Sequence, residues 1–235
     1  HFLPYPENKA YAQLADAIAP RSWSAWARVI STAALCWQRV SLGRAQFQRA
    51  VTCGQYTHPE GLFYGGHFAT WSNRIFHPLA ERYLVSRQRV VLIDLHTGLG
   101  PYGYGEVICD HAPNSAGAKT AYNWYGDSVT LPLAGTSSSV PKQGLLDYAW
   151  HRIMNDDCCF VTLEFGTYSV EQLFDSVLAD HRLHADGTLD WPAPQTRAIK
   201  QKIRHHFCPD DEQWRELVLV RARQVIRLAL EGLNK

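Results

Sequence analysis

Three polar side chains follow or interrupt apolar runs, and their types suit proton transfer and metal binding. Asp94 and His96 come directly after residues 90–93, a continuous apolar run that predicts a strand buried on both faces. Glu164 interrupts a second apolar run, residues 160–167. A carboxylate inside an apolar strand is costly unless it is paired or functional. The two strands therefore predict a shared site at one edge of one sheet, with His96 as a metal ligand.

A glycine-rich loop follows His96, and its backbone can approach a ligand closely. It contains Gly98, Gly100, Pro101, Gly103 and Gly105. A buried strand that ends in polar side chains and a glycine loop is typical of α/β active sites. Tyr102 and Tyr104 in this loop are candidates to bind substrate, or to serve as amphipathic cover. The alternative is a hydrogen-bonded core histidine at His96 with glycines that only form turns.

Several longer stretches resemble one protein family. They are DLHTGLGP (94–101), TLEFGT (162–167), GQYTHPEGLFYGG (54–66), TWSNR (70–74), NWYG (123–126) and PDDEQWRELV (209–218). Together they resemble the zinc carboxypeptidase superfamily, and within it a bacterial branch catalogued as domain of unknown function 2817. The resemblance covers nearly the whole chain.

The resemblance implies a zinc-dependent hydrolase of peptides or N-acyl amino acids. His96 matches the third zinc ligand of the superfamily, and Glu164 matches the general base that activates the zinc-bound water. Asp94 shares a face with His96 in a regular strand, so it is a candidate to accept a hydrogen bond from the imidazole and fix its tautomer.

The chain departs from the superfamily at the first two zinc ligands, which come from an upstream His-x-x-Glu motif. That motif is absent here: His58 and Glu60 are too close together, and His77 and Glu81 are one residue too far apart. A single imidazole does not hold zinc tightly. Zinc is therefore expected for the complete domain, and little or none for this chain.

The superfamily also grips a substrate carboxylate with an upstream Asn-Arg pair. Asn73 and Arg74 resemble that pair but follow a different motif, so Arg74 is expected mainly on a helix surface, with substrate contact as the alternative. The start of the chain, from His1, looks like the part just after the family's Asn-Arg-Asn-Phe segment. The chain is thus expected to be the C-terminal two-thirds of such a domain.

Composition excludes several classes of protein. The 235 residues are 46% hydrophobic and 19% charged with a formal net charge of +1, which suits one globular domain and gives no electrostatic reason to bind nucleic acid or an anionic membrane. No apolar run reaches about 18 residues, so no membrane span is expected. Six cysteines without a Cys-x-x-Cys pair favour reduced thiols and a cytoplasmic location.

The order of elements predicts an α/β fold with a mixed, largely parallel central sheet and helices on both faces. The resemblance implies a zinc carboxypeptidase-like topology that lacks its first strands. Helices are expected over 7–18, 22–41, 44–53, 70–85, 115–124, 143–154, 170–180, 197–207 and 212–230. Residues 1–53 are expected to form a helical insertion, 54–180 the sheet core with the site, and 195–232 the closing helices. An uncovered sheet edge would favour self-association.

Three functions fit these patterns. The first is amide or peptide hydrolysis, by a carboxypeptidase or an N-acyl amino-acid deacylase. The second is a catalytically incomplete fragment or pseudoenzyme that acts as a binding module. The third, a helical interaction protein, is disfavoured by the two polar strand ends. A serine run at 137–139 lacks the Gly-x-Ser-x-Gly elbow of hydrolases, so it is expected to be a polar loop.

Overall fold

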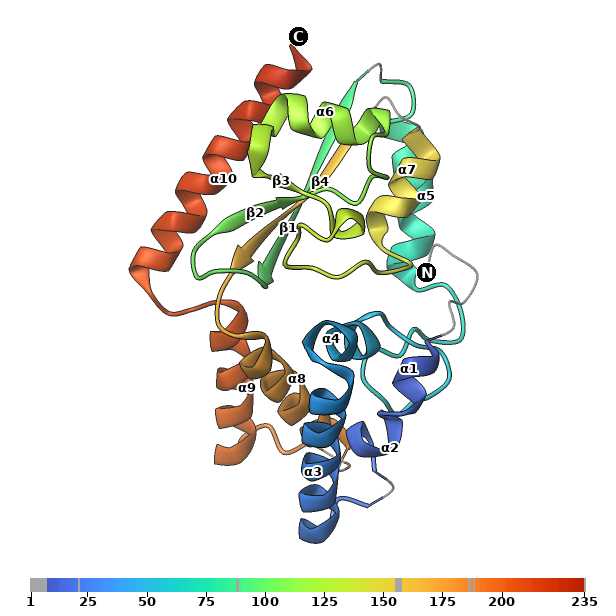
Figure 1. Ribbon diagram of the computed structural model, residues 1–235, viewed down its shortest axis with the longest axis vertical. Coiled ribbons are helices and arrows are strands. Elements are labelled where there is room, and N and C mark those ends of the chain that lie inside the picture. The colour runs from blue at the N-terminus through green and yellow to red at the C-terminus, as the bar shows by residue number, and fades with distance from the viewer. Residues whose placement is uncertain are drawn as a thin grey trace.

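A computed structural model describes residues 8–20, 22–87, 89–154, 158–185, 187 and 189–234 (Figure 1). A β-sheet with its covering helices forms one end of the molecule, and a layer of helices forms the other. His1, where a truncated domain was expected to begin, lies outside the described residues.

Four strands form a single sheet in the part of the chain that the structure describes. They are β1 (Val90–Gly98), β2 (Gly105–Ile108), β3 (Val129–Thr130) and β4 (Cys158–Gly166), in the order β1-β4-β2-β3. β1 pairs with β4 and β2 pairs with β3 in parallel, whereas β2 and β4 are antiparallel. The expected mixed and largely parallel sheet is confirmed.

The helices largely match the expected ranges, apart from the first. They are α1 (Lys9–Ala12), α2 (Ala15–Ile18), α3 (Ala25–Leu42), α4 (Arg44–Thr52), α5 (Trp71–Tyr83), α6 (Ala116–Tyr125), α7 (Leu146–Met154), α8 (Val170–Ala185), α9 (Pro194–Phe207) and α10 (Glu212–Leu233). The expectation of one helix over 7–18 is wrong. A turn at Gln13 and Leu14 separates α1 from α2, because α1 packs on α4 while α2 packs on α3.

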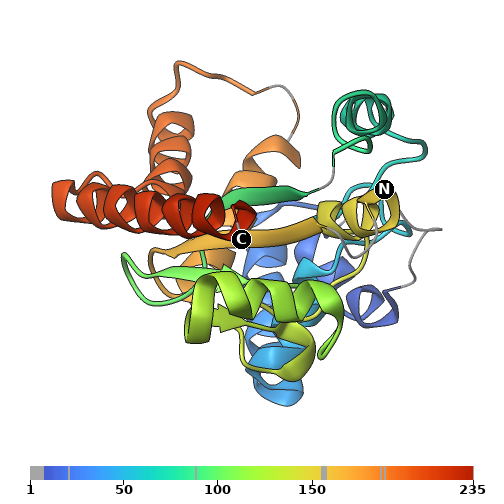
Figure 2. The ribbon, with the colours of Figure 1, turned by 90° about the horizontal axis from the view of Figure 1, so that it is seen from above.

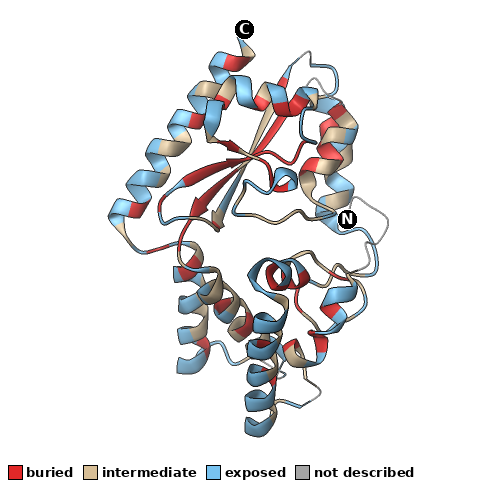
Figure 3. Ribbon diagram, viewed as in Figure 1, coloured by how far each residue is buried: buried red, intermediate tan, exposed pale blue. Residues whose placement is uncertain are grey.

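Alternating residues of β4 face two different cores, as the period of two in a strand requires. Cys159, Val161, Leu163 and Phe165 belong to a core shared with α6 and α10. Cys158 and Phe160 belong to another, shared with α5 and α7. Helices thus lie on both sides of the strands (Figure 2), and the strands are mostly buried while the outer faces of α3 and α10 are exposed (Figure 3).

β1 is less buried than the sequence indicated. Residues 91–93 are half-buried, so the expectation of a strand buried on both faces is wrong there. β1 lies at the edge of the sheet and pairs only with β4 among the described strands, which leaves its other edge uncovered by a strand. Residues 160 and 161 of β4 are buried as expected, because β4 lies between β1 and β2.

The helical layer has a core of its own beyond the carboxyl ends of β1 and β4. Tyr11, Leu14 and Ile18 are fully buried there, packed with Phe47 of α4 and Leu178 of α8. This layer faces the end of the sheet where β1 releases its polar residues (Figure 1). The molecule therefore has two packed bodies with the polar strand ends between them.

Two further expectations concern the cysteines, which were expected to be reduced, and the helices, none of which was expected to span a membrane. All six cysteines lie among the described residues and none of them is in a disulfide bond, and neighbouring Cys158 and Cys159 lie in different cores. Within the described ranges, every helix is too short or too polar to cross a membrane.

Candidate acid–base site

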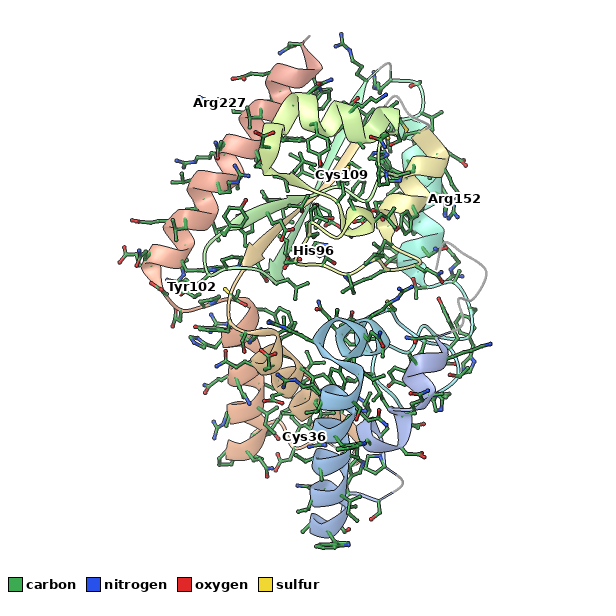
Figure 4. The ribbon with its side chains drawn as sticks, in the orientation of Figure 1. Cys36, His96, Tyr102, Cys109, Arg152 and Arg227 are labelled. Atoms are coloured by element: carbon green, nitrogen blue, oxygen red, sulfur yellow. The ribbon has the colours of Figure 1, made fainter. Side chains whose placement is uncertain are left out.

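His96 and Glu164 lie directly opposite each other in the parallel pairing of β1 with β4. Asp94 is two residues before His96, so it projects from the same face of the sheet. Figure 4 shows His96 at the end of the sheet that faces the helical layer. The adjacency expected from the sequence is confirmed, while the roles of these side chains remain predictions.

The His96 ring lies between two carboxylates. Its Nε2 atom is 3.0 Å from Asp94 Oδ2, and its Nδ1 atom is 3.8 Å from Glu164 Oε2. The hydrogen bond to Asp94 is the main cause that raises the pKa of His96, and burial works against it. Asp94 thereby favours a proton on Nε2 and leaves Nδ1 directed at Glu164.

Glu164 is buried and receives a single hydrogen bond from the described residues, from the backbone N–H of Leu99 to Oε1 at 3.0 Å. Burial raises the pKa of Glu164, and the Leu99 N–H and His96 offset part of that rise. A carboxyl group of this kind keeps its proton to higher pH than an exposed one, and its anion is a stronger base.

The glycine loop places the Leu99 amide over Glu164. Gly98 and Gly100 have φ values of 139° and 98°, which favour glycine. The loop is tied to the end of β4 by Gly103 N–H donating to Gly166 O at 3.0 Å. At Gly166 a side chain would collide with the carbonyl of Pro101, so the close approach of loop and strand requires glycine.

A cavity of about 450 Å³ lies between the sheet and the helical layer. Asp94, His96 and Glu164 line it from the sheet, while Phe47 of α4 and Phe174 of α8 line it from the helices. A cavity of this volume with apolar walls and a few polar groups is typical of a small-molecule site.

Asp110, Lys142 and Asp147 form a second polar group in the same cavity. Burial raises the pKa of Asp110 and raises that of Asp147 to about 7, and each carboxyl affects the other. Burial also lowers the pKa of Lys142. No local sequence pattern indicates that these three residues meet, because only the fold brings the end of β2, the loop before α7 and α7 together.

Glu106 faces Glu164 across the antiparallel pairing of β2 with β4. Its Oε1 atom accepts from Thr130 Oγ1 at 2.6 Å, Ser137 Oγ at 2.8 Å and Ser138 N at 3.1 Å. Ser138 Oγ donates to Oε2. Four donors therefore satisfy this buried carboxylate, and sequence reasoning did not single it out.

The remaining candidates lie elsewhere. Tyr102, labelled in Figure 4, donates its hydroxyl to Asp211 Oδ2 at 2.5 Å in a solvent-exposed contact. Tyr104 and Arg74 are exposed. None of these three candidates is among the described residues that line the cavity. The structure thus brings together Asp94, His96 and Glu164, but not Tyr102, Tyr104 or Arg74.

The described residues do not make a complete zinc site. His96 suits one ligand position, because Asp94 occupies Nε2 and leaves Nδ1 with a lone pair directed into the site. Catalytic zinc usually has three protein ligands. Among the described residues there is no group of three or more His, Cys, Asp or Glu side chains that could hold a metal ion.

The chain thus has a mixed α/β fold with a histidine–carboxylate site at the end of its sheet. The chain belongs to the family described as "Protein of unknown function (DUF2817)", whose sequence profile matches residues 1–221. No match was found among curated proteins or among solved structures.

Proposed function

We propose that the chain is a hydrolase of amide or peptide bonds in which Glu164 is the general base. The observation that carries this proposal is a buried carboxylate with a raised pKa and one hydrogen-bond donor, beside an oriented imidazole in a cavity. Structural carboxylates in buried sites are normally well supplied with donors. Glu164 is undersupplied, so its free lone pairs can accept a proton from a bound molecule.

The proposed reaction needs one water molecule. The Glu164 carboxylate accepts a proton from water while the water oxygen bonds to the carbonyl carbon of the substrate. The carbon–nitrogen bond then breaks, and Glu164 returns the proton to the leaving amine, which restores the carboxylate. Burial raises the pKa of Glu164, which suits both its acceptance of a proton from water and the return of that proton to the amine.

Membership of the zinc carboxypeptidase superfamily is part of the same proposal. It is supported by the motifs around His96 and Glu164 and by the pairing of these residues on neighbouring strands. When bound, a zinc ion supplies an acidic water and polarises a carbonyl group. His96 is the described residue that would contact it, and the steps above do not depend on it.

The cavity favours a substrate with an apolar portion. Phe47, Phe63, Phe160 and Phe174 line it together with the polar residues of the sheet. A volume of about 450 Å³ suits the acyl chain or apolar side chain of an N-acyl amino acid or a short peptide.

A binding module without turnover is the second candidate. The observation that favours it is the lack of a three-ligand metal group among the described residues. Such a protein would use the same cavity to hold a ligand and would not need the basicity of Glu164.

One assay separates the two candidates. The chain is incubated with a panel of N-acetylated amino acids and dipeptides, with and without added zinc, and free amine is measured. Hydrolysis that is lost in Glu164→Gln supports the hydrolase. If calorimetry detects binding of a panel member but no amine is released under either condition, the binding module is the correct function.

A further inference from the structure

The hydroxyl groups of the serine run at 137–139 differ in their partners, and that of Ser139 donates to Val140 O at 3.5 Å. Ser137 and Ser138 donate to Glu106, whereas Ser139 lies against a lysine. The Nζ atom of Lys142 is 2.5 Å from Ser139 Oγ, and both residues line the cavity. The expectation that this run is only a polar loop therefore misses a serine–lysine contact inside the cavity.

The hydrogen bonds of Glu106 help to fix Ser139 in place. Glu106 accepts from the backbone N–H and the hydroxyl of Ser138, and Ser137 Oγ accepts from the N–H of Ser139 at 3.0 Å. The backbone that carries Ser139 is thus anchored to β2 by a network of hydrogen bonds. A nucleophile has to be held in this way to act at a defined position.

Lys142 has the surroundings of a base. Within the described residues its ammonium has one hydrogen-bond partner, Ser139, and no carboxylate close enough for an ion pair. Burial lowers its pKa, although Asp110, Cys53, Glu164 and Asp147 act in the opposite direction at longer range. Lowering the pKa of a lysine increases the neutral fraction that can accept a proton.

We propose that Ser139 and Lys142 form a nucleophile and base for acyl transfer, a reactive site distinct from His96 and Glu164 in the same cavity. A serine three residues before a lysine is a spacing that unrelated acyl-transfer enzymes use for a serine nucleophile. The ligand class is an activated carbonyl or phosphoryl compound, such as an ester, with an apolar group that fits between the phenylalanines of the cavity.

The acyl-transfer step balances with water as the only co-reactant. Neutral Lys142 accepts the proton of Ser139 Oγ while Oγ bonds to the carbonyl carbon. The bond to the leaving group breaks, and the leaving group takes the proton from Lys142. Water then attacks the acyl-serine, Lys142 accepts its proton, and Oγ recovers that proton as the acid leaves.

Covalent labelling tests this site. The full chain is treated with diisopropyl fluorophosphate, which forms an Oγ–P bond and releases fluoride, and the adduct is located by intact mass and peptide mapping. We expect one adduct, on Ser139, and none in Ser139→Ala. Mapping of the wild-type adduct alone decides the site if Ser139→Ala does not fold.

A conservative variant tests whether Lys142 acts as the base. Lys142→Arg keeps the positive charge and a hydrogen-bond donor but cannot lose a proton, so labelling should slow by about 100-fold or more. Lys119→Arg, an exposed lysine on α6, is the matched control and should label at the wild-type rate. Lys142→Met tests the same point if Lys142→Arg does not fold.

Two results would overturn the proposal: no adduct on Ser139 in the folded wild-type chain, or labelling of Lys142→Arg at the wild-type rate. The readout needs neither amide hydrolysis nor Glu164. A chain that hydrolyses amides but is not labelled would refute only the serine–lysine site. A chain that is labelled but hydrolyses no amide would refute only the function proposed for Glu164.

Discussion

The β2–β3 side of the sheet and the β1–β4 side each bury a glutamate, and the two glutamates face each other in register. On the β2–β3 side Glu106 receives four hydrogen bonds, from Thr130, Ser137 and Ser138. On the β1–β4 side Glu164 receives one, from the Leu99 amide. Both side chains are buried on the same face of the sheet, so burial alone does not distinguish them.

The difference shows how donor supply separates a structural carboxylate from a reactive one. Glu106 uses its lone pairs to hold Thr130 and the 137–138 loop, with three donors on Oε1 and one on Oε2. Glu164 has lone pairs left over, and burial raises its pKa. We infer that the first residue serves folding and the second serves chemistry.

The largest expected effect is on turnover. Glu164→Gln keeps the shape of the side chain and removes the proton acceptor, so amide hydrolysis should fall by about 10²- to 10⁴-fold. The thermal unfolding curve should stay close to wild type, because an amide is easier to bury than a carboxylate. The rate of amine release measures the turnover of this variant, and a circular-dichroism melt measures its thermal stability. Unchanged turnover would remove Glu164 from the reaction.

Substitution of Glu106 should lower the free energy of unfolding. Glu106→Ala leaves the donors of Thr130, Ser137 and Ser138 without their acceptor, which should cost about 3 kcal/mol or more. Glu164→Ala removes only one such bond and should cost about 1 kcal/mol. Urea unfolding of both variants measures the difference. Equal losses in the free energy of unfolding would show that the number of hydrogen-bond donors does not distinguish Glu106 from Glu164.

Asp147 provides a third carboxyl for the comparison. Like Glu164, it has few donors, accepting from the N–H of Tyr148 at 2.8 Å, and its pKa is raised to about 7, mainly by burial. An unfolded aspartate titrates near about 4. Between about pH 4 and pH 7 the unfolded chain therefore loses a proton that the folded chain keeps, and stability falls as pH rises.

Asp147→Asn should remove this dependence. The wild-type free energy of unfolding should fall by at most about 1.4 kcal/mol per pH unit from this group, and the variant should show a flatter profile over the same range. Urea unfolding at several pH values makes the measurement. Parallel profiles for the two proteins would show that Asp147 ionises normally.

The smallest effect is expected at Tyr102, in the exposed part of the glycine loop. Tyr102→Phe removes the hydrogen bond to Asp211, and both side chains are solvated, so the melting temperature should shift by less than about 2 °C. Turnover should not change, because Tyr102 does not line the cavity. A marked loss of turnover would show that the loop closes over the substrate.

Much of the fold was accessible from the sequence because the apolar patterns are local. The runs at 90–93 and 160–167 identified β1 and β4, and the helix expected over 143–154 corresponds to α7. The edge position of β1 was not accessible, because an apolar run reports side-chain burial and not which strands lie beside it. The break between α1 and α2 depends on packing against α3 and α4, which the local sequence does not encode.

The site was accessible only where polar residues interrupt apolar strands. Asp94, His96 and Glu164 stood out for that reason, and the fold brings them together. Asp110 and Asp147 follow no short motif, and the pKa shifts of these two residues and of Lys142 arise from tertiary burial. Tyr102 and Tyr104 were chosen by their distance along the chain from His96, which does not determine the direction of a loop side chain.

Glu164 has to accept a proton for the proposed hydrolysis, and titration of its carboxyl group measures whether it can. The carboxyl carbon of Glu164 can be followed by NMR across the pH range, with the resonance assigned by its loss in Glu164→Gln. We expect a midpoint clearly above the ordinary range of about 4, since burial outweighs the single Leu99 hydrogen bond. A midpoint at or below that range would contradict it, because Glu164 would then be an ordinary stabilised carboxylate.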